Sequence, residues 1–148
     1  MELSENEISK VVVDAAIEVH RGLGGPGLLD SVYEESLAWE LESRGLSVLR
    51  QLEVPIRYTG NLLATPLKLD LLANKLVIVE VKAVTVYNKI FETQALTYLR
   101  LMNLKLALVI NFGEAKVGSG IHRVVNGLEG QGRPYVNPLR LSVFAYLR

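Results

Sequence analysis

Two acidic residues and a lysine are spaced so that they could share one face of a β-sheet. The segment Leu76–Lys82 is almost continuously apolar, as is typical of a strand buried on both faces, but it ends in Glu80 and Lys82. Because these two residues are two positions apart, their side chains point to the same face. A structural ion pair at the sheet edge is the favoured interpretation of Glu-x-Lys alone, since the tripeptide is common and buried charges need partners.

Asp70 favours a chemical interpretation instead. If strands 67–72 and 76–82 pair around a three-residue connection, Asp70 faces Ile78 and lies one diagonal step from Glu80. It then shares a face with both charges of the Glu-x-Lys pair, whereas a two-residue turn would move it to the opposite face. Two carboxylates this close need more positive charge than one lysine supplies, and a divalent cation such as Mg²⁺ would provide it through oxygen ligands.

A third carboxylate lies on a helix expected at residues 28–44. The apolar stripe of this helix consists of Leu29, Val32, Tyr33, Leu37 and Leu41. Glu34 flanks the stripe and can lean toward the sheet, whereas Glu35 falls nearly opposite and is expected in solvent. The alternative for Glu34 is an ordinary border residue of an amphipathic helix.

Gln94 and Tyr98 are four residues apart on a second expected helix, at 88–102, and therefore share one face of it. They could contribute polar contacts to a site on the sheet. The alternative is that Tyr98 is simply half-buried and that Gln94 is a surface residue.

The elements that must position these residues follow from the sequence pattern. Ser4 and Glu7 form a plausible capping box ahead of a helix that runs to about His20, and a glycine-rich loop at 22–27 follows. Strands are expected at 48–58, 67–72, 76–81, 104–110 and 121–125, with residues 73–75 connecting the second and third. This order indicates an α/β fold with a mixed central sheet, in which the 88–102 helix is a right-handed crossover between parallel strands.

Composition narrows the functional classes. The 148 residues suffice for one domain, and 49% hydrophobic and 22% charged residues are typical of a globular protein. The absence of cysteine excludes thiolate chemistry and cysteine-ligated metals. The polar start and the lack of a long apolar stretch predict neither a secretory signal nor a membrane span, so a cytoplasmic protein is expected.

The charge is balanced, with 16 basic and 16 acidic residues, which argues against binding nucleic acid by overall charge alone. A local groove could still be formed by Arg50, Lys68, Lys89, Arg100 and Lys105. Beyond a region rich in Gly and Pro at 127–138, the apolar segment 139–147 is expected to pack on the domain or on a second subunit, forming a homodimer.

Asp70, then Glu80-Val81-Lys82, then Gln94-x-x-x-Tyr98 resemble the PD-(D/E)XK nuclease superfamily with its auxiliary Q-x-x-x-Y motif. More narrowly, residues 27–34 resemble the signature of the bacterial GxxExxY proteins of that superfamily. The resemblance extends from about Ile8 to Asn126. It departs from the family pattern at three positions: Asp30 in place of Glu, Leu69 in place of Pro, and Phe91 in place of His.

The resemblance implies a restriction-endonuclease-like core over residues 1–126 and a C-terminal extension over 127–148. It implies that Asp70, Glu80 and Glu34 hold Mg²⁺ or Mn²⁺, with the Val81 carbonyl as a further ligand. Lys82 would orient or deprotonate the attacking water and stabilise transition-state charge. Gln94 and Tyr98 would position the nucleic-acid backbone or the other site residues.

The function expected from these roles is a metal-dependent phosphodiesterase, a nuclease acting on DNA or RNA. Two alternatives remain open at this point. One is a non-catalytic binding or accessory module on the same fold, since fold does not determine function. The other is a structural or assembly protein that dimerises through the segment 139–147.

Overall fold

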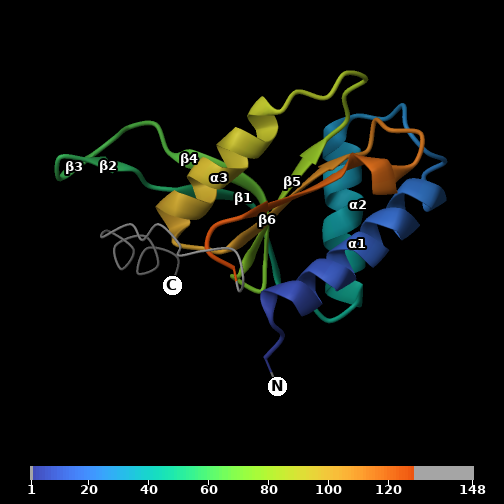
Figure 1. Cartoon of the computed structure of the whole chain (residues 1–148), viewed down its shortest axis with the longest axis horizontal. Helices are drawn as coiled ribbons and strands as arrows, with labels where there is room; N and C mark the ends of the chain where they lie inside the picture. Colours follow the sequence, from blue (N-terminus) through green and yellow to red (C-terminus); the bar gives the residue numbers. More distant parts are fainter. Residues whose placement is uncertain (1, 129–148) are drawn as a thin grey trace.

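The structure of the chain is a computed structural model that describes residues 2–128 (Figure 1). Its three helices and the five strands of its main sheet follow the predicted order. The elements are α1 (Glu5–Gly22), α2 (Asp30–Ser43), β1 (Val48–Val54), β2 (Arg57–Tyr58), β3 (Asn61–Leu62), β4 (Leu67–Ala73), β5 (Val77–Lys82), α3 (Ile90–Met102), β6 (Leu106–Asn111), a 3₁₀ turn (Val117–Gly120) and β7 (Ile121–Val125). The expected segment 139–147 lies outside the described residues.

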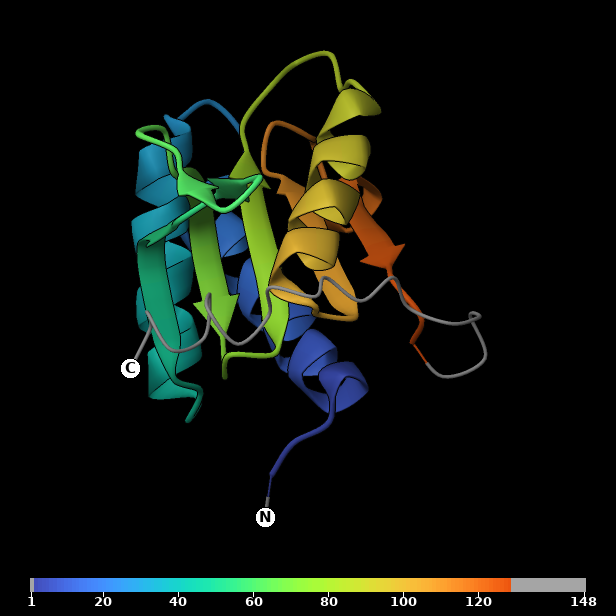
Figure 2. The ribbon, with the colours of Figure 1, turned by 90° about the vertical axis from the view of Figure 1, so that its left-hand side faces the viewer.

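The central sheet is mixed, as predicted. Its strand order is β1-β4-β5-β6-β7; β5 and β6 are parallel and the other neighbours are antiparallel. Helix α3 connects the two parallel strands, which confirms that it is a crossover. Helices α1 and α2 cover one face of the sheet and α3 covers the other (Figure 2).

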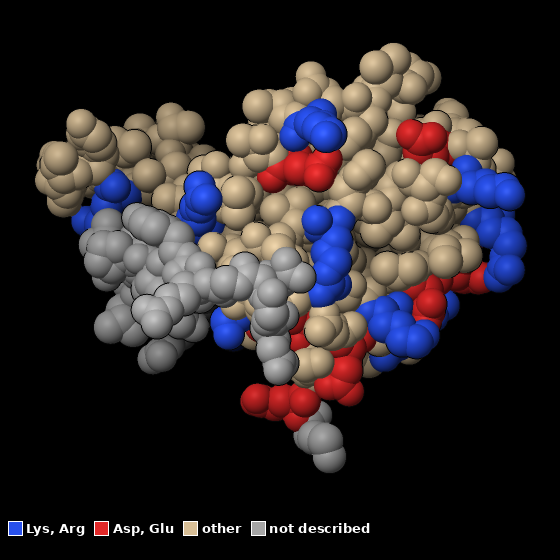
Figure 3. Space-filling model, in the orientation of Figure 1, with Lys and Arg blue, Asp and Glu red and all other residues tan. Residues whose placement is uncertain are grey.

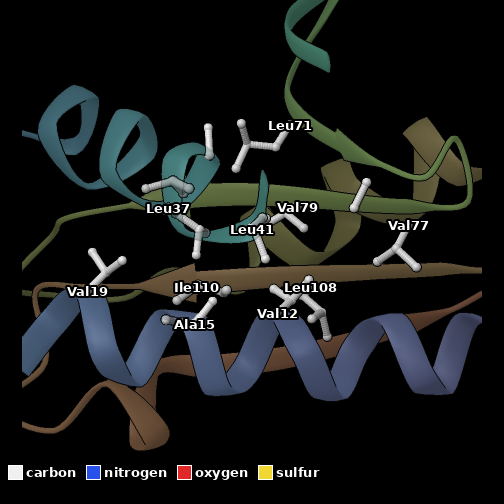
Figure 4. Close-up of a cluster of buried hydrophobic side chains, with 14 of the residues drawn as sticks. Val12, Ala15, Val19, Leu37, Leu41, Leu71, Val77, Val79, Leu108 and Ile110 are labelled. Carbon is white, nitrogen blue, oxygen red and sulfur yellow. The ribbon is translucent and has the colours of Figure 1, made fainter. Parts of the chain in front are cut away.

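The alternation along the central strands produces a hydrophobic core on each face. Val77, Val79 and Val81 of β5 pack on the side of α1 and α2, and Ile78 packs on the side of α3. Figure 4 shows the first core, where α1 and α2 side chains meet those of β4, β5 and β6. Helix α1 begins at the predicted capping box, in which the Ser4 and Glu7 side chains each accept the other's backbone N–H.

The strand predicted at 48–58 is wrong in its second half. The pairing of β1 ends at Val54, because Pro55 has no N–H to donate to a ladder. Strand β2 pairs instead with β3, in a separate hairpin that projects from the main sheet at the left of Figure 1. Thr59 and Gly60, at φ +47° and +82°, supply the left-handed conformations that a tight hairpin turn requires.

The register predicted for the β4–β5 hairpin is wrong by two residues. The structure pairs Ala73 with Val77, so that the connection is 74–76 instead of 73–75. Asn74 adopts a left-handed conformation in this turn, and its side chain accepts the Ser47 N–H at 2.8 Å. Because a shift of two residues leaves every side chain on its original face, the predicted face of Asp70 does not change.

No helix in the described part of the chain is both long and apolar enough to span a bilayer.

Candidate metal and catalytic site

Asp70 and Glu80 lie immediately beyond the last ladder pair of β4 and β5, Leu71 with Val79. There, side chains replace the backbone ladder. The Asp70 N–H donates to Glu80 Oε2 at 2.9 Å, and the Val81 N–H donates to Asp70 Oδ2 at 2.8 Å. Each carboxylate is thus held by the backbone of the opposite strand, which fixes the two acids next to each other.

Burial dominates the electrostatics of Glu80, which is only 6% exposed. Desolvation, and then the negative charge of Asp70, raise its pKa to about 8, although the Asp70 N–H and the Lys82 ammonium act in the opposite direction. Glu80 is therefore largely protonated at neutral pH when no cation is bound. A cation ligand at this position must first lose a proton.

Glu34 reaches the same place from α2. It is 6% exposed, whereas Glu35 is exposed to solvent, as the helical stripe predicts. Its Oε2 lies 3.3 Å from Arg50 Nη2, and its Oε1 accepts a 2.6 Å hydrogen bond from Gln51 Nε2. Burial, and then the negative charge of Asp70, nevertheless raise the pKa of Glu34, so this helix carboxylate interacts electrostatically with an acid of the sheet.

The sheet changes face where these acids meet. Leu71 and Leu69 are two positions apart on β4 and would normally pack on the same side. Instead, Leu71 belongs to the core under α1 and α2, and Leu69 belongs to the core under α3. Asp70 lies between these two leucines. Its side chain accepts a hydrogen bond from Gln51, which also binds Glu34 of α2, and its backbone N–H donates to Glu80 of β5.

Lys82 ends β5 on the α3 side. Its Nζ lies 4.7 Å from the centroid of the Phe91 ring, a cation–π contact with α3. It lowers the pKa of Glu80, yet within residues 2–128 no ion pair joins it to a carboxylate. The interpretation of Glu-x-Lys as a simple structural ion pair is therefore wrong for the described structure.

The two polar residues of α3 differ in their surroundings. Tyr98 is half-buried. Burial, and then the negative charges of Glu80 and Asp70, raise the pKa of its phenol, so the hydroxyl keeps its proton. Gln94 is exposed to solvent, one turn earlier. Tyr98 is thus close enough to Glu80 and Asp70 to interact with their charges, whereas Gln94 lies on the exposed surface of α3.

The surface charge agrees with the balanced composition. On the face drawn in Figure 3, lysine and arginine side chains lie in several separate groups and are interspersed with acidic ones. All five basic residues predicted to form a groove are exposed, and Arg50 also forms an ion pair with Glu34.

The donor chemistry of the site fits a hard divalent cation. Carboxylate oxygens are the ligands that Mg²⁺ and Mn²⁺ prefer. Burial, and then the negative charge of Asp70, raise the pKa values of Glu80 and Glu34, and a cation would offset that negative charge. Within the described residues, however, no three Asp, Glu or His side chains are already arranged to hold an ion. A cation bound here would therefore need further oxygen ligands or a shift of Glu34.

Two residues near the site were not predicted as site residues. Gln51 links Glu34 to Asp70, but a glutamine within a strand pattern gives no signal of that role. Asn111 is fully buried: its Oδ1 accepts the N–H groups of Val84 and Gly113, and its Nδ2 donates to Val84 O. These bonds fix the chain that leaves Lys82. A buried polar residue at the end of the apolar β6 run was the available signal.

Comparison with known proteins agrees with this geometry. No curated protein and no solved structure matches the chain significantly. Residues 6–124 match the family described as the PD-(D/E)XK nuclease superfamily, whose members typically use divalent metal ions. This match covers most of the chain and includes Glu34, Asp70, Glu80, Lys82, Gln94 and Tyr98. The chain therefore belongs to the PD-(D/E)XK nuclease superfamily.

Proposed function

We propose that this protein is a metal-dependent nuclease that hydrolyses phosphodiester bonds of DNA or RNA with Mg²⁺ or Mn²⁺. The observation that carries the proposal is the interlock of Asp70 and Glu80 across two strands, with Lys82 two residues further along β5. The superfamily match over residues 6–124 supports it. The match with the GxxExxY signature at 27–34 further suggests membership of that narrower group.

Asp70, Glu80 and Glu34 are the proposed cation ligands. The Asp70 and Val81 N–H groups orient the first two, so their free oxygen lone pairs are directed by backbone and not by flexible side chains. When bound, the divalent cation supplies Lewis acidity toward the scissile phosphate and compensates the clustered negative charge. Glu80 releases its proton on binding because its pKa in the metal-free protein is about 8.

Lys82 is the proposed catalytic cation. Its ammonium rests on the Phe91 ring and pairs with no carboxylate among residues 2–128, so within this part of the chain it can turn to an incoming phosphate without breaking an ion pair. At the phosphate, Nζ would donate hydrogen bonds to the water and to the oxygens that gain charge in the transition state. Tyr98, which keeps its phenolic proton, and Gln94 would position the backbone of the substrate.

One alternative has its own supporting observation. Within the described residues, no three acids are arranged for a cation, and Lys82 is engaged by an aromatic ring. A non-catalytic accessory module, with Asp70 and Glu80 serving as a structural closure of the β4–β5 hairpin, is consistent with both facts. The proposal and this alternative differ in whether the protein binds Mn²⁺ and cuts nucleic acid.

The test is cleavage of linear, circular and branched DNA and of RNA, with Mn²⁺, with Mg²⁺ and with chelator. Wild type is compared with Lys82→Ala and with Lys116→Ala, which removes an exposed lysine outside the site. We expect metal-dependent cutting that only Lys82→Ala abolishes. Cutting that survives Lys82→Ala, or the absence of both cutting and Mn²⁺ binding in wild type, would refute the proposal and favour the accessory module.

A further inference from the structure

Gln51 has an unusual backbone for a residue inside a strand. Its φ is +47°, although the flanking residues Arg50 and Leu52 remain paired with Leu71 and Leu69 of β4. For a residue other than glycine, the left-handed conformation costs roughly 1–2 kcal/mol. Such a conformation persists only where the surrounding structure holds it, and it is enriched at functional sites.

The strained residue lies beside the acids of the site. Gln51 Nε2 is 2.6 Å from Glu34 Oε1 and 3.4 Å from Asp70 Oδ1. Both atoms are acceptors, so only the NH₂ end of the amide can face them, and its two hydrogens can serve one carboxylate each. The Gln51 nitrogen therefore occupies a point toward which a helix carboxylate and a strand carboxylate both direct an oxygen.

The left-handed backbone also matches the change of face in the sheet. Arg50 contacts Glu34 of α2, whereas Leu52, two positions later, packs with the core under α3. An extended residue at position 51 would place both neighbours on the same side. The inversion leaves the Gln51 side chain at the boundary between the two layers, where Glu34 and Asp70 can both be reached.

We propose that Gln51 is a positioning residue that holds the carboxylates of Glu34 and Asp70 together as one cation-binding pair. This inference rests on the proposed function and adds to it a residue from β1. The amide keeps the two oxygens close to one point before a cation arrives, so binding does not have to bring two like charges together. Preorganisation of this kind lowers the cost of binding.

Gln51→Gly separates this role from a structural one. Glycine adopts φ +47° without strain, so the variant removes the amide while relaxing the backbone. We expect its melting temperature to equal or exceed that of wild type, and its Mn²⁺ affinity, measured by electron paramagnetic resonance, to fall at least about tenfold, as for other residues that orient metal ligands. Melting temperature and metal affinity would then change independently or in opposite directions.

Lys75→Gly is the matched control. Lys75 has φ +56° in the exposed turn between β4 and β5, so the change relaxes the same backbone conformation away from the acids. Its Mn²⁺ affinity should equal that of wild type. Gln51→Asn is a second variant, because asparagine tolerates the left-handed region and keeps the amide but is one methylene shorter. It should lose affinity as Gln51→Gly does.

The outcomes distinguish this inference from the proposed function. Wild-type Mn²⁺ affinity in either Gln51 variant would overturn the bridging role while leaving the nuclease proposal intact. An equal loss in Lys75→Gly would overturn it as well, since backbone relaxation alone would then explain the effect. Absence of Mn²⁺ binding in wild type would overturn both.

Discussion

The protonation of Glu80 predicts an inverse dependence of stability on pH. In the metal-free folded protein its pKa is about 8, because of burial and the nearby Asp70, against an ordinary value of 4.5. Below about pH 4.5 the carboxyl is protonated in both the folded and the unfolded chain and has no effect. Between 4.5 and 8 the unfolded chain releases this proton and the folded chain retains it, so the free energy of unfolding decreases as pH rises.

The magnitude follows from the two pKa values. They differ by about 3.5, and each pKa unit corresponds to ~1.4 kcal/mol, so the folded state loses at most about 5 kcal/mol by pH 8. Glu80→Gln removes this ionisation and retains an oxygen that can accept the Asp70 N–H. We expect the variant to be about as stable as wild type near pH 5 and more stable by several kcal/mol near pH 8.

Urea unfolding with chelator at pH 5, 6.5 and 8 measures this effect, and Glu35→Gln is the control because Glu35 is an exposed acid on α2. A stability difference between wild type and Glu80→Gln that is the same at all three pH values would refute the reasoning. In wild type, Mn²⁺ affinity should rise with pH up to about 8, because binding must displace the proton. Glu80→Gln should lose this dependence together with most of the affinity.

Three further predictions concern the packing around the site. Gly113→Ala should destabilise the protein by more than ~2 kcal/mol in urea unfolding, because the added Cβ would lie 2.2 Å from Val84 O. The control Gly118→Ala, whose Cβ would meet nothing within 4 Å, should change stability by less than ~0.5 kcal/mol. Equal losses of stability in the two variants would contradict the predicted clash. Tyr33→Phe should lower the free energy of unfolding by roughly 1–2 kcal/mol, because the buried Tyr33 hydroxyl donates to Gly25 O at 2.7 Å and accepts the Leu28 N–H. An unchanged unfolding midpoint would show that these two hydrogen bonds contribute nothing to stability. Asn111→Ala should raise hydrogen exchange at the Val84 and Gly113 amides and reduce any Lys82-dependent cutting, and unchanged exchange would exclude Asn111 as the anchor of that segment.

Much of the fold could be predicted from the sequence, because the spacing of apolar residues indicates which face of a helix or strand is buried. The apolar run of β5 identified the strand that carries Glu80, and Tyr33, Leu37 and Leu41 of the predicted stripe identified the helix face that carries Glu34. The first two residues predicted for that stripe, Leu29 and Val32, are exposed because they lie at the start of α2. The hairpin register could not be predicted, since it depends on which residues adopt left-handed turn conformations. The predicted proximity of Asp70 and Glu80 was nevertheless correct, because the error was an even number of residues.

The contribution of β1 could not be predicted for a different reason. Sequence patterns assume that a strand alternates faces throughout, and at Gln51 this strand does not. The left-handed residue contacts Glu34 and Asp70, which are 17 and 19 positions away in the chain, and both of its neighbours are paired with β4. Long-range contacts therefore outweigh a local backbone preference here, and such contacts are invisible to any argument from neighbouring residues.

The position of the acids couples the site to the fold. The β4–β5 ladder stops at Leu71 and Val79, and the next hydrogen bonds between these strands are made by the Asp70 and Glu80 side chains. The backbone groups that these acids satisfy would otherwise need other partners, because an unpaired N–H near the core is costly. The carboxyl oxygens of Asp70 and Glu80 that this pairing leaves over lie near Glu34, where burial raises the pKa of both glutamates. If the proposed cation binds beside these acids, it would offset their clustered negative charge, which gives a physical reason why metal binding and stability should respond to the same residues.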